Sequence, residues 1–358
     1  SMGNLAFDLE DRFINKAFII VSAMLCYVYN CRCGFIRTGG VIVEVALLQG
    51  KHFDTKPIKR VIRSSEGHSG RKTRSAAQTQ YREYLMAYLT INGLNIYYEM
   101  HGEGETILLL HHGFGCTRMW KTIYPGLVKG GYCAVMYDRR GYGRSEEGPD
   151  FDRFYTSPSF RAEGIKELET VRKMLGLESF HLVGQCEGGV VSVDYATRYP
   201  KQVQSITISS TQCYNDIPIP ELNRKMFPKP LRELDPGLQE KMAEWHGRER
   251  AGRFFDMFRD RGGSYGTGVF DMRPILPAVT CPVLVLYPDR SALFDVEQGV
   301  AFYHHLPNSE LAVLPKCGHN TYENQPVEYV RNVLSFLERQ KTYVPPEYFN
   351  ATCVAPEC

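Results

Sequence analysis

A cysteine between glycines follows a short apolar run near the middle of the chain. Residues 184–188 read Gly-Gln-Cys-Glu-Gly, directly after the run of residues 180–183. A strand that ends in Gly-x-nucleophile-x-Gly and opens into a helix holds its nucleophile on a sharp turn, which only small neighbours tolerate. The positive end of the following helix favours a thiolate. The pattern indicates that Cys186 is a nucleophile for acyl transfer; the alternative is a buried, inert cysteine in a glycine-rich turn.

Three further motifs surround this cysteine in the sequence. An apolar run of strand length ends in His-His-Gly-Phe-Gly at residues 111–115. Another apolar run is followed by Tyr-Asp-Arg-Arg-Gly-Tyr-Gly-Arg-Ser at residues 137–145. A third short run leads into Gly318 and His319, ahead of a predicted helix over residues 326–339.

Taken together and in this order, the motifs resemble those of the α/β-hydrolase fold family, over about residues 88–337. The resemblance implies an α/β fold: a mostly parallel central sheet with helices on both faces and an inserted helical cap. It also implies a structural role for residues 137–145, as a tight connection beside the active site.

The resemblance assigns roles to four positions. Cys186 would be the nucleophile, and His319, which follows the last strand, would be its general base. The backbone N–H groups of Phe114 and Glu187 would form an oxyanion hole. Removal of one such donor raises the activation free energy by roughly 3–4 kcal/mol.

The position of the acid departs from the family pattern. Relatives usually carry Gly-x-x-Asp after the penultimate strand. In this sequence Pro288 stands at the position of the glycine, and Ser291 stands at the position of the aspartate. We favour Asp289, reaching His319 through a shifted loop. The alternatives are Asp216, or no acid at all, because a thiol is acidic enough to need less support than a serine hydroxyl.

Alternating strands and helices predict the organisation of the chain. A hairpin over residues 87–100, with its turn at Asn92-Gly93, precedes the alternation. Predicted strands cover 107–111, 134–137, 181–185, 205–209, 283–286 and 310–314, and predicted helices include 161–175 and 189–198. The domains expected are a basic and poorly defined N-terminal extension (1–85), a core (86–210 and 278–340), a helical cap (211–277) and a flexible tail (341–358).

The predicted cap carries large apolar residues at helical spacing among many charges, as in residues 238–255. Trp245, Phe254 and Met257 are candidates to contact the substrate, and packing of the cap onto the core is the alternative for each. A pocket of this kind suits a small apolar molecule.

A covalent mechanism follows from these assignments. Cys186 would form a thioacyl-enzyme with an ester, thioester or lactone, and water would release the acyl group. The alternatives are an acyltransferase, a C–C bond hydrolase, or a ligand-binding protein that has lost turnover. Dehalogenases and epoxide hydrolases need a carboxylate at the elbow, which is the sharp turn that carries the nucleophile. Cys186 therefore argues against these two activities.

Composition limits the partners. Residues 1–85 carry 13 Lys and Arg against 7 Asp and Glu, and the remaining residues carry 29 against 33. Residues 86–358 therefore have no basic excess that favours nucleic acid. Eleven cysteines without regular spacing predict no metal site, and no cofactor motif is present. We expect a small-molecule substrate and a cytoplasmic protein, with the oligomeric state left open.

The N-terminal extension allows two interpretations. Met86 directly precedes the first family-like strand, so we expect it to be the native start, with residues 51–80 disordered where present. The rival is a membrane tether at residues 17–29, although about 13 apolar residues fall short of the roughly 20 that a spanning helix needs.

Overall fold

The computed structural model describes residues 84–342 and two short strands, β1 (Phe35–Thr38) and β2 (Val41–Glu44). The chain divides into two compact units, residues 1–79 and 80–358. In the first unit, β1 and β2 pair antiparallel. The apolar segment 17–29, the segment 51–80 and the tail beyond residue 342 lie outside the described residues.

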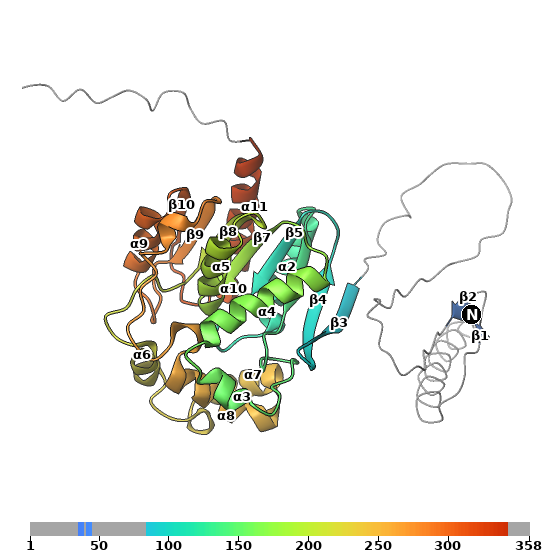
Figure 1. Ribbon diagram of the computed structural model, residues 1–358, viewed down its shortest axis with the longest axis horizontal. Helices are drawn as coiled ribbons and strands as arrows, with labels where there is room; N and C mark the ends of the chain where they lie inside the picture. Colours follow the sequence, from blue (N-terminus) through green and yellow to red (C-terminus); the bar gives the residue numbers. More distant parts are fainter. Residues whose placement is uncertain (1–34, 39–40, 45–83, 343–358) are drawn as a thin grey trace, which may run out of the picture. The chain divides into compact units, whose positions relative to one another are not determined.

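The second unit is built on an eight-stranded sheet with the order β10-β9-β8-β7-β5-β6-β4-β3 (Figure 1). Strands β3 and β4 form the predicted hairpin, and β4 also pairs antiparallel with β6. All other neighbouring pairs are parallel. The mostly parallel sheet is thus confirmed. Its strands are β3 (Tyr84–Ile91), β4 (Leu94–His101), β5 (Thr106–Leu110), β6 (Cys133–Tyr137), β7 (Phe180–Gln185), β8 (Val203–Ser209), β9 (Val283–Pro288) and β10 (Ser309–Leu314).

Helices cover both faces of this sheet, because alternate strand residues bury side chains on opposite sides. Leu108, Leu182 and Val285 pack in one core with α4, α5 and α9, whereas Leu109 and Leu284 pack in another with α2 and α11. The helices outside the 211–277 segment are η1 (Thr117–Thr122), α2 (Tyr124–Lys129), α3 (Phe151–Tyr155), α4 (Phe160–Met174), α5 (Glu187–Arg198), α9 (Glu297–His305), α10 (Thr321–Asn324) and α11 (Pro326–Thr342).

The segment between β8 and β9, residues 211–277, is helical and is called the cap segment below. Its longer helices gather with α3 at one end of the sheet (Figure 1). Gly247 takes φ 85°, a left-handed conformation, and divides the expected helical run 238–255 into two helices. The elements are α6 (Ile219–Met226), η2 (Leu231–Glu233), α7 (Pro236–His246), α8 (Arg248–Arg261), η3 (Gly263–Tyr265) and η4 (Leu276–Ala278).

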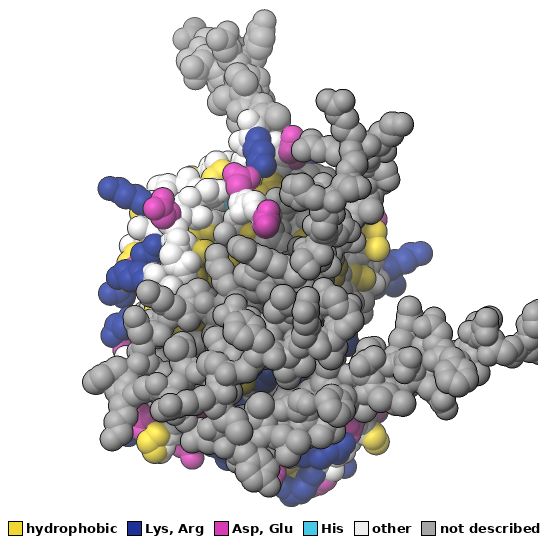
Figure 2. Space-filling model, turned by 90° about the vertical axis from the view of Figure 1, so that its right-hand side faces the viewer, with side chains coloured by type: hydrophobic (Ala, Val, Ile, Leu, Met, Phe, Trp, Pro, Cys, Tyr) yellow, Lys and Arg dark blue, Asp and Glu magenta, His cyan; other side chains and the backbone are white. Residues whose placement is uncertain are grey.

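The described residues show whether any helix could span a membrane, and part of their surface charge is visible (Figure 2). Within the part of the chain that the structure describes, no helix is long and apolar enough to cross a membrane. On the face in Figure 2, the visible Lys and Arg side chains are interspersed with Asp and Glu.

Candidate active site

The elbow holds Cys186 in a strained conformation between β7 and α5. Its φ of 51° and ψ of −114° lie in a region that side chains rarely adopt. The neighbouring glycines permit this turn: a Cβ at Gly188 would overlap the Leu110 carbonyl, and one at Gly189 would overlap Thr211. The Cys186 N–H donates to the Ser209 carbonyl at 2.8 Å, which fixes the turn to β8.

The Cys186 thiol is buried against the cap segment. Its Sγ lies 3.6 Å from the hydroxyl of Tyr265 and lines a cavity of about 300 Å³. Burial raises the pKa of the Cys186 thiol to about 12, although the Tyr265 hydroxyl and the Glu187 N–H act to lower it. The resting side chain is therefore a neutral thiol.

The structure brings His319 to the same cavity. Its carbonyl accepts hydrogen bonds from Gln185 Nε2 at 2.9 Å and from Ser210 Oγ at 2.7 Å, so the ends of β7 and β8 fix its position. Burial lowers the pKa of the His319 imidazole to about 4. Among the hydrogen bonds of the described residues, none joins His319 to Cys186, so the two neutral groups share the cavity without a resting ion pair.

A hydrogen bond in which His319 donates to Asp289, as expected from the sequence, is not among those of the described residues. Asp289 instead accepts from the Cys317 N–H at 3.0 Å, and backbone hydrogen bonds from Lys316 and Cys317 lower its pKa. Ser291 takes the place beside the histidine, with Oγ 3.2 Å from His319 Nδ1. Asp216, the other candidate acid, is exposed.

Ser291 biases the protonation of the histidine ring. Its Oγ accepts hydrogen bonds from the Leu293 N–H at 3.2 Å and the Phe294 N–H at 3.1 Å. With both lone pairs used, the Ser291 hydroxyl donates to His319 Nδ1 and leaves the ring proton on Nε2. A carboxylate at this position would favour the opposite tautomer, which leaves Nε2 free as a base.

The predicted oxyanion donors differ in their availability. The Phe114 N–H donates to His112 Nδ1 at 3.1 Å, and His112 Nε2 then donates to the Tyr322 hydroxyl at 3.0 Å. The Glu187 N–H lies at the thiol, where it acts to lower the Cys186 pKa. Only the second of these two backbone groups therefore points to the nucleophile.

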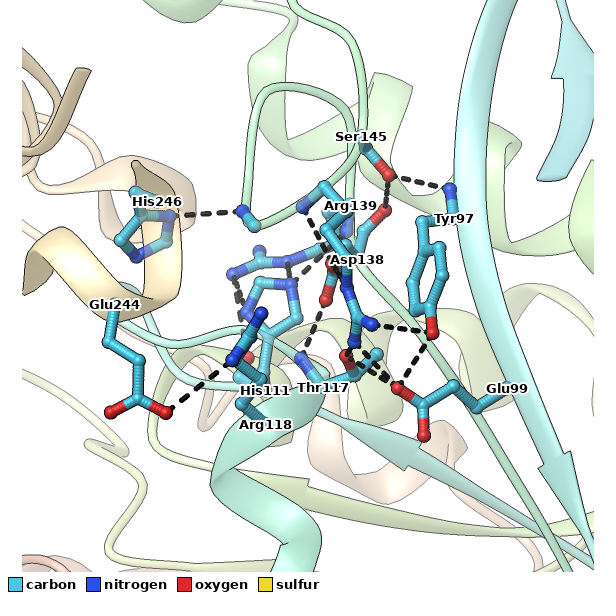
Figure 3. Close-up of polar contacts among 12 residues, drawn as sticks. Tyr97, Glu99, His111, Thr117, Arg118, Asp138, Arg139, Ser145, Glu244 and His246 are labelled. Carbon is cyan, nitrogen blue, oxygen red and sulfur yellow. Dashed lines mark hydrogen bonds and ion pairs between the residues drawn. The ribbon is translucent and has the colours of Figure 1, made fainter. Parts of the chain in front are cut away.

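The side chain of Glu187 is completely buried and is not among the residues that line the cavity. It forms an ion pair with Arg139 at 2.6 Å and accepts the Ser264 N–H at 2.5 Å. The Arg139 backbone N–H donates to the His111 ring at 3.2 Å, and Figure 3 shows the two side chains side by side. One carboxylate thus joins the elbow to the 137–145 connection and to η3 of the cap segment.

The 137–145 connection is structural, as the resemblance implied. The Asp138 carboxylate accepts the Thr117 N–H at 2.6 Å and the Arg144 N–H at 2.8 Å (Figure 3). Ser145 donates to the Asp138 carbonyl at 2.5 Å and accepts the Tyr97 N–H at 2.8 Å. These bonds tie β4, β6 and η1 together beside the site.

The three predicted substrate contacts fall in different places. Trp245 lines the cavity, beneath the ammonium of Lys241 at 4.7 Å from its ring centre. Phe254 stacks on His246 instead, at 4.1 Å between ring centres, and Met257 packs with the aromatic cluster of the cap segment. Neither is among the lining residues, because the inward face of α8 is supplied by Phe255 and Phe258.

Sequence reasoning missed two polar residues of the cap segment. Tyr265 contacts the nucleophile. His246 accepts the Gly143 N–H at 3.0 Å and donates from Nε2 to the Phe114 carbonyl at 2.9 Å, so it anchors the loop of residues 111–115. Position 246 gives no signal in the sequence, whereas Gly262-Gly263-Ser264-Tyr265-Gly266 indicates an unusual turn.

No metal centre is formed by the described residues, in which no group of three or more His, Cys, Asp or Glu is placed to hold an ion. The Cys186 thiol and the His319 imidazole line the cavity, with the Tyr265 hydroxyl beside them.

Comparison with known proteins agrees with this architecture. Residues 105–266 match the model of a family described as "alpha/beta hydrolase fold". The chain has the α/β-hydrolase fold. Among solved structures, the chain is similar to 2-hydroxy-6-oxo-6-phenylhexa-2,4-dienoate hydrolase from Rhodococcus sp. strain RHA1. The TM-score is 0.58, and the identity is 18% over 72% of this chain and 99% of the hydrolase.

Curated proteins of similar sequence include proline iminopeptidases. This α/β-hydrolase-fold chain is 31% identical to that of Lactobacillus helveticus over 179 residues, which are 49% of this chain and 57% of the relative. The chain thus spans little more than half the length of this relative. It is 27% identical to that of Lactobacillus delbrueckii subsp. lactis over 71% of this chain and 98% of the relative.

Proposed function

We propose that the chain hydrolyses an ester, thioester or lactone with a small apolar acyl group, using Cys186 as a covalent nucleophile. The observation that carries the proposal is the conformation of Cys186. A strained φ of 51° is found at Cys186, the one cysteine among the described residues that line the cavity shared with His319.

Covalent catalysis begins as Cys186 Sγ attacks the carbonyl carbon. The S–H proton passes to His319, the C–S bond forms, and the carbonyl electron pair moves onto oxygen, where the Glu187 N–H donates to it. Because thiol and imidazole are both neutral at rest, proton transfer accompanies the attack. Collapse expels the leaving group with the proton from His319, and water then hydrolyses the thioacyl-enzyme.

A cysteine nucleophile favours substrates that have a good leaving group, such as thioesters and activated esters, over amides. A thiolate nucleophile is itself expelled readily, so a poor leaving group such as an amide nitrogen would return the intermediate to substrate. The Ser291–His319 contact weakens the base further, since His319 must adopt the other tautomer to accept the proton.

The lining of the cavity favours a neutral, apolar acyl group. Met242, Trp245, Phe255 and Phe258 are among its lining residues. Lys241, the one Lys, Arg, Asp or Glu among the described lining residues, already pairs with Glu323 at 2.5 Å. A proline iminopeptidase substrate carries a free imino group, and this lining offers it no carboxylate. We therefore favour an acyl group without an ammonium.

A second function, ligand binding without turnover, is favoured by the protonation of the site. A neutral thiol, a neutral imidazole and Ser291 at the acid position are what a protein that keeps the pocket but not the chemistry would show. Acyl transfer to another acceptor would share the acyl-enzyme and differ only in what releases it.

The test is hydrolysis of a series of p-nitrophenyl esters and aliphatic acyl thioesters by the full chain. Cys186→Ala is expected to abolish turnover, while Cys281→Ala, which changes a buried cysteine outside the cavity, keeps it. Turnover that survives Cys186→Ala would contradict the proposal. Saturable binding of these compounds with no turnover by the unaltered chain would favour the second function.

A further inference from the structure

Tyr265 is the hydrogen-bond partner of the candidate nucleophile. It ends η3, in the cap segment, and its hydroxyl lies 3.6 Å from Cys186 Sγ. Its side chain is buried and lines the same cavity as Cys186 and His319. A hydroxyl at this distance from the attacking sulfur is also within reach of an oxygen on the carbon that the sulfur attacks.

The proton of the Tyr265 hydroxyl has a defined direction. The Gln212 N–H approaches Tyr265 Oη at 3.5 Å and occupies its acceptor side. Burial raises the pKa of Tyr265 well above its ordinary value, so the phenol keeps its proton at neutral pH. The hydroxyl is therefore a donor directed at the Cys186 side of the cavity.

The Phe114 N–H, which the family pattern would use at the oxyanion, has another acceptor. It is held by His112 Nδ1 at 3.1 Å, and His112 is in turn held by the Tyr322 hydroxyl. The His246 contact to the Phe114 carbonyl fixes the next peptide of the loop as well. With this donor engaged, the Glu187 N–H alone of the two predicted donors faces the nucleophile.

A buried ion pair helps to place Tyr265. Glu187, the residue after the nucleophile, accepts the Ser264 N–H at 2.5 Å while Arg139 balances its charge. Gly263, at φ 56°, lies so close to the Glu187 carboxylate that a Cβ there would overlap it. The elbow itself therefore sets the position of the residue next to Tyr265.

We propose that the Tyr265 hydroxyl is a catalytic residue that replaces the Phe114 N–H as the second oxyanion donor. The inference rests on the proposed function. When Cys186 Sγ bonds to the carbonyl carbon, its proton goes to His319 and the carbonyl electron pair goes to oxygen. Tyr265 keeps its own proton and moves its hydrogen bond from sulfur to that oxygen, beside the Glu187 N–H.

The experiment compares two reactions of Cys186 in the unaltered chain and in Tyr265→Phe. Hexanal adds to a thiol as a hemithioacetal, which places an oxygen in the oxyanion position. Iodoacetamide alkylates the same sulfur without forming an oxyanion. Tyr265→Phe is expected to weaken hexanal binding and to slow ester acylation by about 100-fold, while the alkylation rate changes only a few-fold.

Tyr287→Phe is the matched control. Tyr287 is also buried and loses one hydrogen bond, to the Thr211 carbonyl at 3.0 Å, but it does not line the cavity. It should leave hexanal binding within a few-fold of the unaltered chain. Equal losses of hexanal binding and alkylation in Tyr265→Phe would mean that Tyr265 only positions the thiol, and would overturn the inference.

A substitution that keeps the side-chain shape guards against misfolding. 3-Fluorotyrosine at position 265 makes the hydroxyl a stronger donor, so hexanal should bind more tightly; unchanged binding would count against the inference. If neither esters nor hexanal react with Cys186 in the unaltered chain, it is the proposed function that fails. If they react equally well in Tyr265→Phe, only the role of Tyr265 fails.

Discussion

Ser291 Oγ lies 3.2 Å from His319 Nδ1, in the place where a triad acid would stand. Its two backbone donors, Leu293 and Phe294, would suit a carboxylate equally well. The site therefore has the geometry of a triad with the charge removed, and this relationship limits how strong a base His319 can be.

Ser291→Asp should accelerate acylation of Cys186. A carboxylate would hold the proton on Nδ1, free Nε2 as the base and stabilise the imidazolium, for a gain of about 10- to 100-fold. Single-turnover release of p-nitrophenol measures this. Ser291→Asn is the control of similar size without charge. If the acylation rate rose as much in Ser291→Asn as in Ser291→Asp, the missing charge would not be what limits the site.

The pH dependence of thiol reactivity should be that of an unactivated cysteine. With the Cys186 pKa raised to about 12, the thiolate fraction near pH 8 is on the order of 10⁻⁴ and grows tenfold per pH unit. Alkylation of Cys186 by iodoacetamide, followed by mass spectrometry between pH 6 and 9, should rise along this line. A plateau near neutral pH would reveal a thiolate–imidazolium pair and contradict the neutral resting state.

Turnover should fall on the acid side only at low pH. His319 must be neutral to accept the proton, and burial lowers its pKa to about 4, so activity is retained above this value and is lost as pH falls through it. The pH profile of kcat/KM checks this, with chain integrity followed by circular dichroism. An acid limb near 6.5 would show that the imidazole is solvated in the working enzyme.

Glu187→Gln should destabilise the fold strongly. Arg139 would remain buried without its counter-charge, and removing one partner of a buried ion pair costs about 3–5 kcal/mol. The free energy of unfolding in urea measures this. Glu328→Gln, which breaks the exposed pair with Arg331 on α11, should cost less than about 1 kcal/mol, and similar losses in the two variants would refute the prediction.

The charge of the acyl group should decide between substrates of equal shape. The p-nitrophenyl esters of cyclopentanecarboxylic acid and of proline differ mainly by the ring nitrogen, which is protonated in proline. Because the described lining presents no carboxylate, the cyclopentane ester should have the higher kcat/KM, by about 100-fold or more. Preference for the proline ester would instead support an iminopeptidase.

The fold was predictable from the sequence because its signals are local. The Asn92-Gly93 turn, the apolar runs and the glycines of the elbow each dictate backbone structure within a few residues. In the cap segment, the run 238–255 is helical as its spacing indicated, but the break at Gly247, which takes φ 85° and separates two helices, was not predicted.

The site was only partly predictable, because its remaining contacts are long-range. The approach of Tyr265 to Cys186 depends on the Glu187–Ser264 bond, which joins residues 77 positions apart. The role of Asp289 depends on the path of the loop after β9. That path decides whether the carboxylate accepts from the Cys317 N–H, as it does here, or from His319. Neither contact leaves a periodic or spaced pattern.

The most direct test of the central claim is the mass of the protein after a brief exposure to an acyl donor. With p-nitrophenyl butyrate and acid quenching, Cys186 should carry one butyryl group, located by peptide mapping, and Cys186→Ala should carry none. The other described cysteines should stay unmodified, since none of them lines the cavity. A butyryl group on another residue, or turnover with no adduct at Cys186 even under rapid quenching, would contradict the assignment of Cys186 as the nucleophile.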